Sequence, residues 1–498
     1  MGRLPIGPVD VAVLVAFLAS AVAVGILAAR RTRSLDAYLL GDRDLPWWVI
    51  LGSIVATETS AATVLSVPAE GFGAAGFRFL QLPAGYLLGR IAIVRFLLPL
   101  YFAGRLDTAH EVLETRFGPM VRRAAAGMFL VCRSLGDGLR LYLAGIVLER
   151  LTGMPLAVAI VAMGVVTVAY TVLGGLRSVA WNDCVQLVVY VVGGLAAVGV
   201  LLDRIPGGWP AAWEWAAAHD KLRVVDTRFD LADPWTLWAG LVGGAFLSLG
   251  THGTDHMMVQ RYLAARSFGD AARAVVGSGV VVFLQFFLFV GIGVLLGAFH
   301  ALSGEPAPAR PDEIFAAFIV DHFPRDTGLV GLFLAAILAA AMSTVSSSLN
   351  ASASSFLHDF WIPLAGRPGS EEALLSATRR LTVLFGAVQV AVGIAAPALG
   401  ETVIRAALSI AGYASGALLG VFALGLRRRR PGERATLLGA AAGVLALLAV
   451  QFLLPASGVR VAFPWFALLG AAVTVATALA LARLEDRSAP RHPDGARR

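Results

Sequence analysis

The chain has 498 residues, of which 58% are hydrophobic and 15% are charged, and its mean hydropathy is +0.76. Because soluble domains carry about 25% charged residues, this composition excludes an ordinary water-soluble protein. The formal net charge of +7 does not indicate nucleic-acid binding, since arginine-rich loops beside a membrane give the same balance. We therefore expect a lipid bilayer as the main solvent and no nucleic-acid partner.

Apolar segments of roughly 20 residues, the length that an α-helix needs to cross a bilayer, recur along the chain. Segments such as 156–173 lack the alternation of apolar and polar residues that is typical of membrane β-strands. We predict an all-α polytopic membrane protein with about 13 transmembrane helices, numbered spans 0 to 12. The predicted spans cover residues 11–29, 46–68, 77–103, 120–149, 155–173, 179–202, 236–260, 274–300, 328–357, 378–397, 402–426, 435–454 and 462–482.

The distribution of Lys and Arg predicts the orientation of these spans. If the loops lie alternately on the two sides of the membrane, most of the basic residues fall on the side that follows spans 0, 2, 4, 6, 8, 10 and 12. Because basic residues favour the cytoplasmic side, we predict a multi-pass inner-membrane protein with its N-terminus outside and its C-terminus in the cytoplasm. Span 0 is interpreted as uncleaved, since its positive charges follow the apolar segment.

Nothing in the sequence marks a second folded domain or a catalytic centre. We assign residues 1–482 to a single domain and residues 483–498 to a disordered cytoplasmic tail. Cys132 and Cys184 both fall within predicted spans, which disfavours a disulfide framework. No nucleophile with a base, phosphate loop or zinc-ligand spacing occurs, so we expect no enzymatic activity, and no obligate protein partner is evident.

Span 1 contains a polar segment, residues 56–63, with Glu58 near the middle of the apolar run. Intramembrane polar groups are costly unless they face a cavity, an ion or a partner. The hydroxyls of Thr57 and Thr63 can bond to the preceding helical turn. Alternatively, the helix unwinds here and its carbonyls coordinate a cation. The sequence alone leaves both interpretations open.

Span 8 carries a row of small polar residues, and span 5 carries one acidic residue near its start. Ala340, Ser343, Thr344 and Ser347 share one helical face, with Ser346 at its edge. Hydroxyl oxygens suit a hard cation, but small residues also favour close helix packing. Asp183 is compatible with a stabilising charge at a helix N-terminus, and a partner in space would be needed to make it a site.

Three motifs together resemble the sodium:solute symporter family. They are YTVLGGLRSVAWNDCVQ in span 5, GTDHMMVQRYLAAR at the end of span 6, and AAAMSTVSSSLNASASSFLHDF in span 8. The resemblance extends from span 0 to span 10 and implies a leucine-transporter-type fold with inverted repeats. The first repeat would cover residues 46–202 and the second 236–426, with spans 1 and 6 broken and two extra spans at 435–482. A polar segment at 250–254 in span 6 matches the break in span 1.

The resemblance also implies the ion sites. A first sodium site would use the carbonyls of Ala56, Thr59 and Ala340 and the hydroxyls of Ser343 and Thr344. A second site, present in some members, would use Asp183, Ser346 and Ser347, with Ser343 as a shared ligand. Compatible residues stand at all of these positions. We therefore expect Na⁺ as the coupling ion, with one or two ions per cycle, and no other metal.

The family's substrate cavity corresponds to Glu58, Ser60, Thr63, Gln81 and Thr251. Two departures limit the identity of the solute: Thr251 stands where a sugar-transporting relative has a tyrosine gate, and Gly136 stands where sialic acid carriers have a carboxylate-binding arginine. The sequence thus predicts a small polar organic solute without naming it.

Span 3 places Arg133, Asp137 and Arg140 on one helical face. This spacing fits an internal ladder of ion pairs. It also fits an arrangement in which Arg140 binds a substrate carboxylate and Glu58 pairs with Arg140 or binds the solute. We expect Gln260, Arg261 and Tyr262 to end span 6 at the cytoplasmic interface.

Sodium-coupled symport is the predicted function. A proton-coupled or uncoupled carrier of the same fold and a transporter-like membrane sensor are the alternatives. In the proton-coupled alternative, titration of Glu58 or Asp183 replaces sodium binding.

Overall fold

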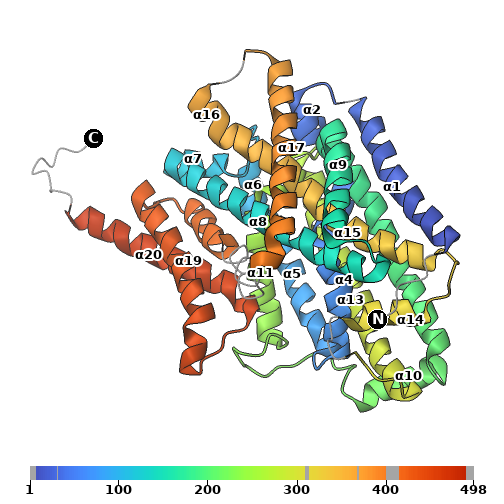
Figure 1. The fold of residues 1–498 in the computed structure, drawn as a ribbon. Coiled ribbons are helices and arrows are strands. Elements are labelled where there is room, and N and C mark those ends of the chain that lie inside the picture. Colours follow the sequence, from blue (N-terminus) through green and yellow to red (C-terminus); the bar gives the residue numbers. More distant parts are fainter. Residues whose placement is uncertain (1–6, 31, 309–312, 367–368, 400–413, 489–498) are drawn as a thin grey trace, which may run out of the picture.

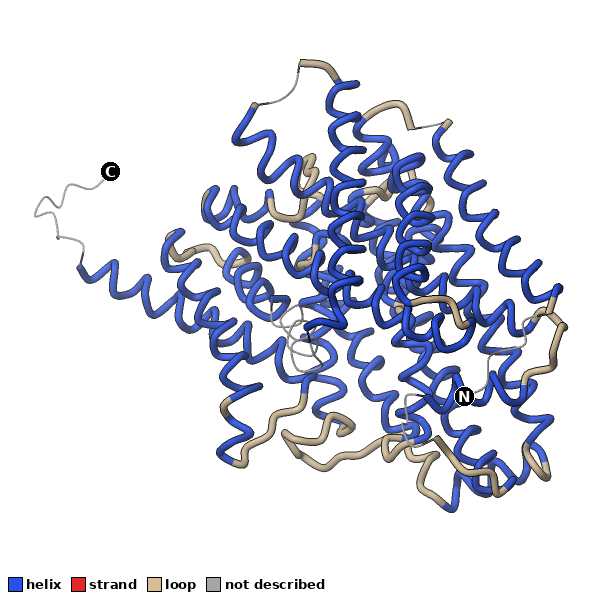
Figure 2. Tube along the Cα trace, viewed as in Figure 1, coloured by secondary structure: helices blue, strands red, loops and turns tan. Residues whose placement is uncertain are grey.

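The computed structural model describes residues 7–30, 32–308, 313–366, 369–399 and 414–488. These residues are helical or in connecting loops, apart from an isolated bridge pairing between Leu45 and Ala265, as Figure 2 shows. The predicted all-α architecture is therefore confirmed for the described residues. Eight of the described helices are long and apolar enough to cross a membrane by length and composition.

These eight helices are fewer than the 13 predicted spans, because several predicted spans are divided, joined or only partly described in the structure. Two predicted spans are each divided into short helices, and two others are contained in one long helix, α9 (Leu156–Arg204). The predicted span 402–426 is described only from residue 414, where a short apolar helix runs from Ala414 to Gly425.

Helix α15 (Leu329–Ser355) lies at the centre of the bundle and packs against α9, α1 (Pro8–Ala29) and α8 (Pro119–Thr152) (Figure 1). All of its residues from Val330 to Ser355 are buried except Leu332. A helix that is buried on every side must satisfy its polar groups through neighbouring helices, because neither water nor lipid reaches them. The serines and threonines of α15 therefore face the interior of the bundle rather than lipid.

Gly175 divides α9 into the two predicted spans of this region. Its backbone has φ 56° and ψ −151°, a conformation that side chains rarely adopt, and the chain around it is otherwise helical. A Cβ atom at this position would lie 2.3 Å from the Tyr38 carbonyl oxygen. Glycine is thus required both by the backbone and by the close approach of α2 (Leu35–Leu40).

Predicted span 1 is a broken helix, consisting of α3 (Trp47–Glu58) and α4 (Ala61–Phe72). Thr59 and Ser60 between them have extended backbone conformations. Ser60 begins α4 with a reciprocal capping box, in which its side chain accepts from the Thr63 amide and Thr63 accepts from the Ser60 amide. The predicted unwinding within residues 56–63 is therefore confirmed.

Predicted span 6 is also broken. The π-helical segment η4 (Ala239–Gly243) continues as α11 (Gly244–Gly253), and α12 (His256–Leu263) follows. Asp255 begins α12 by accepting a hydrogen bond from the Met257 amide. The break lies at residues 254–255, at the C-terminal edge of the predicted polar segment.

The remaining helices surround this core or lie at its ends. Helices α10 and α14 lie at one end of the bundle and α2, α7 and α16 at the opposite end, while α19 and α20 form a pair at one side (Figure 1). Residues 483–488 of the predicted tail are helical, because α20 continues to Ser488, and residues 489–498 lie outside the described residues. The bounds are η1 (Gly41–Arg43), η2 (Gly76–Leu80), α5 (Gln81–Ala92), η3 (Ile93–Leu97), α6 (Leu98–Tyr101), α7 (Glu111–Phe117), α10 (Gly208–Ala218), α13 (Phe268–Ser303), α14 (Ile314–His322), η6 (Phe356–Trp361), α16 (Ile362–Ala365), α17 (Glu371–Ala395), η7 (Ala396–Leu399), α19 (Glu433–Phe452), η8 (Leu454–Ser457), η9 (Phe463–Trp465) and α20 (Phe466–Ser488).

Candidate functional site

A polar cavity of about 240 Å³ lies where the two broken helices meet α8 and α15. Its wall includes residues from α3, α5, α8, α11, α12 and α15 and also Ser60 just before α4, so it draws on both predicted repeats. The predicted substrate residues Glu58, Ser60, Arg140 and Thr251 all line it. The full lining is Thr57, Glu58, Ser60, Tyr86, Arg133, Arg140, Leu247, Ser248, Thr251, His252, Met257, Met258 and Thr344.

The Glu58 carboxylate, which lines this cavity, contacts an arginine and a histidine. It forms an ion pair with Arg90 of α5, and His252 Nε2 lies 3.3 Å from Glu58 Oε2. Arg90 is fully buried and also donates to Ser278. Of the alternatives open for Glu58, the structure shows an ion pair with Arg90 of the neighbouring helix α5 rather than with Arg140.

The predicted ladder on α8 is present and extends to α12. Asp137 pairs with Arg140 and lies 3.8 Å from Arg133, while Arg133 also forms an ion pair with Asp255. Arg133 thus ties α8 to the residue that begins α12. The Arg140 side chain is 36% exposed, more than those of Arg133 and Glu58, which are 17% and 15% exposed. Arg140 is therefore paired and still accessible from the cavity.

The predicted first sodium site lies where α3 ends against α15. At the end of α3 the Val55 carbonyl accepts from the Thr59 amide, whereas the carbonyls that follow it lie where the helix ends and has no further turn to donate to them. The Thr344 hydroxyl donates to the Thr57 carbonyl at 3.2 Å and contacts the Ala340 carbonyl at 3.4 Å. Neutral hydroxyl and carbonyl oxygens are suitable ligands for a hard cation. The residues present therefore fit sodium.

The other predicted members of this first site surround the same helix end. Ala56, Ala340 and Ser343 are completely buried. Ser343 Oγ donates to Asp183 Oδ1 at 2.6 Å, so in this conformation its hydroxyl is directed to the second predicted site. Thr59 donates through Oγ1 to the Val55 carbonyl, and Gln285 donates to Thr59 Oγ1 at 2.7 Å.

The second predicted site is not assembled as expected. Asp183 is fully buried, but Ser346 donates to the Ser343 carbonyl at 3.0 Å instead of turning to the carboxylate. The guanidinium of Arg261 lies between Asp183 and Ser347, 3.4 Å from Asp183 Oδ2 and hydrogen-bonded to Ser347 Oγ. A nitrogen of the Arg261 guanidinium thus contacts two of the predicted ligands of the second site, Asp183 and Ser347.

Two further predicted substrate residues do not line the cavity. Gln81 uses its amide elsewhere: it donates to the carbonyls of Arg78 and Trp235 and accepts from the Asp226 amide. It therefore anchors the loop before η4. Thr63 is turned to the Ser60 amide in the capping box. In both residues the polar side-chain atoms form hydrogen bonds outside the cavity.

Several residues of the site were missed from the sequence. Arg261 and Tyr262 were expected at the membrane interface, yet they are 1% and 0% exposed. The helix does end just after them, at Leu263, as expected for the end of span 6, but their side chains lie inside the protein because α12 begins at the break. Ser248 also lines the cavity, and its hydroxyl has no hydrogen-bond partner within the described part of the chain. Arg90 and Arg261 could have been recognised as candidate site residues, because a charge inside a membrane span is costly. The sequence does not identify their partners.

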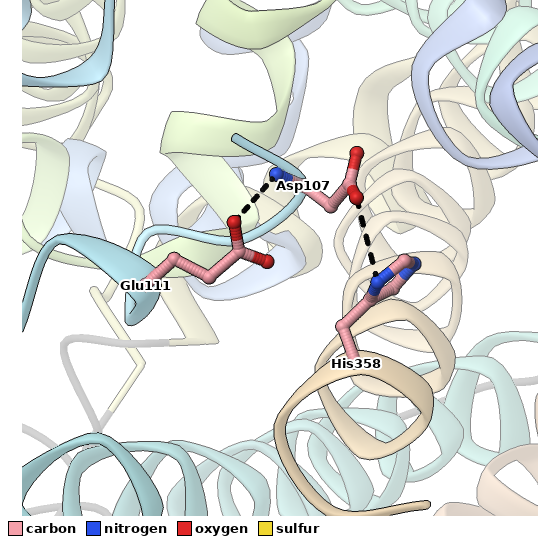
Figure 3. Close-up of side chains that lie close together, drawn as sticks. All are labelled: Asp107, Glu111 and His358. Carbon is pink, nitrogen blue, oxygen red and sulfur yellow. Dashed lines mark hydrogen bonds and ion pairs between the residues drawn. The ribbon is translucent and has the colours of Figure 1, made fainter. Parts of the chain in front are cut away.

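A separate cluster at the opposite end from α10 contains Asp107, Glu111 and His358, whose potential ligand atoms lie within 4.8 Å of one another (Figure 3). His358 contacts Asp107 at 3.6 Å, and Glu111 accepts from the Asp107 amide. Burial raises the pKa of Glu111 to about 7. Arg43 lies 3.0 Å from Asp107 and Arg122 lies 3.4 Å from Glu111. Because both carboxylates already contact arginines, this cluster is better suited to linking α7 with η6 than to holding a metal ion.

Two broken helices that line a shared cavity are the main feature of this helical fold. The fold is similar to a solved structure described as the substrate-bound outward-open state of a Na⁺-coupled sialic acid symporter, with a TM-score of 0.86 and 25% sequence identity. The similarity covers 96% of this chain and 98% of that chain.

The sequence profile described as "Sodium:solute symporter family" matches residues 38–445. The chain therefore belongs to the sodium:solute symporter family. This membership confirms the resemblance carried by the motifs of spans 5, 6 and 8.

Named relatives come from animals. The chain is 30% identical over 431 residues to the sodium-dependent multivitamin transporter of Oryctolagus cuniculus, covering 84% of this chain and 66% of the relative. It is 30% identical over 406 residues to the sodium-coupled monocarboxylate transporter 2 of Mus musculus, covering 80% and 64%. The chain spans slightly less than two thirds of the length of these curated relatives.

Proposed function

We propose that this chain carries out sodium-coupled symport of a small polar organic solute across the inner membrane. The proposal rests on three features that lie next to one another. The end of α3 presents backbone carbonyls, α15 presents the Thr344 hydroxyl to them, and the 240 Å³ cavity includes Thr344 in its wall. An ion bound there would stabilise the arrangement of α3 and α4 at their break. Because these residues also line the solute cavity, the ion would favour one conformation of that cavity.

Alternating access follows from the same arrangement. We propose that residues 46–202 and 236–426 are inverted repeats, each beginning with a broken helix, and that they move about the cavity they share. The N-terminus would lie outside and the C-terminus in the cytoplasm. The loops that the basic residues assign to the two sides agree with the grouping of α10 and α14 at one end and α2, α7 and α16 at the other (Figure 1).

Uptake into proteoliposomes tests the coupling ion. With a panel of labelled organic acids, sugars and amino acids, we expect at least one class to accumulate when a sodium gradient is imposed. A proton gradient without sodium should give no accumulation, because the proposed first site contains only neutral oxygens and has no group that titrates. Accumulation driven by protons alone would favour coupling through Glu58 or Asp183 and would contradict the proposal.

The cavity chemistry favours a solute with a carboxylate. Arg140 is the most exposed of the charged side chains that line it, and Asp137 occupies only part of its five-donor guanidinium. The unpartnered hydroxyl of Ser248 supplies a further polar contact within the described wall. A planar guanidinium binds a carboxylate through two parallel hydrogen bonds. We therefore propose that Arg140 recognises a carboxylate on the solute.

Replacing Arg140 with glutamine is expected to weaken inhibition of uptake by carboxylates by about tenfold or more, since a lost charge-assisted hydrogen bond costs about 1.5–3 kcal/mol. Inhibition constants for a panel of carboxylates and uncharged analogues provide the measurement. Arg273→Gln is the matched control, because Arg273 is 70% exposed on α13 and lies outside the cavity. Equal inhibition by carboxylates and their amides in the unaltered protein would exclude this role.

A further inference from the structure

A groove of about 750 Å³ lies between the second half of α9 and the helices α10 and α13, outside the polar cavity. Its described wall consists of aliphatic and aromatic side chains, one glycine and a single amide, that of Gln285. Helix α10 packs against α9 and α13 at one end of the bundle and contributes to the wall there (Figure 1). The groove shares no lining residue with the polar cavity, so it is a separate feature of the described part of the chain.

The groove opens on the surface that faces lipid. Leu195 on α9 and Leu284 on α13 both line it, and they are 57% and 60% exposed. Both helices are long and apolar enough to cross a membrane, so large apolar side chains exposed on them meet hydrocarbon rather than water. The hydrocarbon of the bilayer therefore has direct access to the groove.

Two tryptophans mark the end of the groove at α10. Trp209 and Trp213 line it, are about half exposed, and have ring centroids 5.8 Å apart. Tryptophan is enriched where the hydrocarbon of a bilayer meets the headgroups, because its ring is apolar and its indole N–H bonds to polar groups. From this end the groove follows residues 281–295 of α13, which is about 21 Å of helix by the α-helical rise. That length is sufficient for a chain that crosses one leaflet, about 15 Å of hydrocarbon.

The lining of the groove disfavours a polar occupant. A peptide segment or a polar solute would bring N–H and C=O groups, whose hydrogen bonds are costly to leave unmade away from water. Gln285 Nε2 already donates to Thr59 Oγ1 at 2.7 Å, and the rest of the described wall offers no other side-chain amide, hydroxyl or charge. An acyl chain needs no hydrogen bonds and gains dispersion contacts by filling the groove.

Gln285 connects the groove with the break in predicted span 1. It is 5% exposed, and its partner Thr59 lies between α3 and α4. We propose that the groove binds one acyl chain of a membrane phospholipid, which lies along α13 and reaches Gln285 next to this break. The bound chain packs against Gln285 and keeps its amide directed to Thr59. This inference goes beyond the proposed symport and does not depend on sodium coupling.

Labelling from within the bilayer tests this inference. The full-length protein in phosphatidylcholine nanodiscs receives a trace of phosphatidylcholine with a photoactivatable diazirine near the end of one acyl chain, and mass spectrometry locates the label without sodium or solute. We expect label at Gln285 and Leu288, which line the groove, and at Val280, which is 46% exposed on α13 and lies outside the lining. Label at exposed residues such as Val280 alone would report bulk lipid and would overturn the inference. An unlabelled Gln285 together with a dimer in native mass spectrometry would assign the groove to a second copy of the chain, and the inference would again be wrong.

A substitution that fills the groove provides a second measurement. Gly291 lines the groove, and the nearest group to a Cβ atom there is Phe77 Cζ at 3.9 Å, so a larger side chain has room at this position. Gly291→Leu should lose the label at Gln285 and keep the label at Val280, because its side chain takes the place of the acyl chain. Should this variant fail to fold, Leu195→Trp narrows the groove from an exposed position and should cause the same loss.

Gly199→Leu is the matched control. Gly199 lies on α9 outside the lining, and a Cβ atom there would meet no described group within 4 Å. This variant should keep the label at both Gln285 and Val280. Undiminished label at Gln285 in a folded filling variant, or an equal loss in Gly199→Leu, would show that the acyl chain does not occupy the groove.

Discussion

Replacing Arg90 with methionine is expected to destabilise the protein by about 3–5 kcal/mol, because removal of one partner from a buried ion pair leaves an uncompensated charge. Arg90 is completely buried, and its partner Glu58 is only 15% exposed. His252, 3.3 Å from the Glu58 carboxylate, offers partial compensation. Unfolding monitored in detergent at neutral pH, with the free energy compared between variants, provides the measurement.

Arg105→Met is the matched control for this loss. Arg105 pairs with Asp36 at 3.1 Å, but its side chain is 76% exposed, and exposed ion pairs contribute about 0–1 kcal/mol. The double variant Arg90→Met/Glu58→Gln should regain a large part of the lost stability, since no buried charge then lacks a partner. If the Arg90 and Arg105 variants lose similar stability, the Arg90–Glu58 pair is not the buried contact that the structure describes.

The positions of the helix breaks could be predicted because each break has a local signal. Polar residues at 56–63 and the glycine and threonine residues at 250–254 interrupt otherwise apolar spans, and the observed interruptions lie at residues 59–60 and 254–255. The Thr344 hydroxyl and the Ala340 carbonyl beside it were also expected from the resemblance, whereas the Thr57 carbonyl, which Thr344 contacts, was not among the expected ligands. The ion that they bind is still a proposal.

The partners of the intramembrane charges could not be predicted in the same way. Glu58 and Arg90 are separated by 32 residues, and Asp183 and Arg261 by 78, so no helical periodicity connects them. Asp137 and Arg140 are three residues apart on one helix, and their ion pair was anticipated for that reason. Arg261 was assigned to the interface because most charged residues near span ends lie there, and only the break before α12 brings it into the core.

Removal of the Thr344 hydroxyl should have the largest effect on coupling. Thr344 is 3% exposed, and its Oγ1 is the side-chain oxygen that meets the Thr57 carbonyl at the end of α3. Thr344→Ala removes one neutral ligand from the proposed first sodium site and leaves the helix backbone intact. We expect the sodium concentration for half-maximal uptake or binding to rise by about tenfold or more, since each 1.4 kcal/mol corresponds to a factor of ten.

Two variants on the same helix separate ion binding from packing. Thr344→Ser keeps the oxygen and should retain most of the sodium affinity. Ser354→Ala removes an equally buried hydroxyl of α15 that has no hydrogen-bond partner among the described residues, so it should leave the sodium dependence unchanged. If Thr344→Ala and Ser354→Ala have the same sodium affinity as the unaltered protein, the coupling ion does not bind at the end of α3. Because Ser343 already donates to Asp183, the first site would then lack a side-chain oxygen of its own, and the proposed coupling mechanism would fail at its first step.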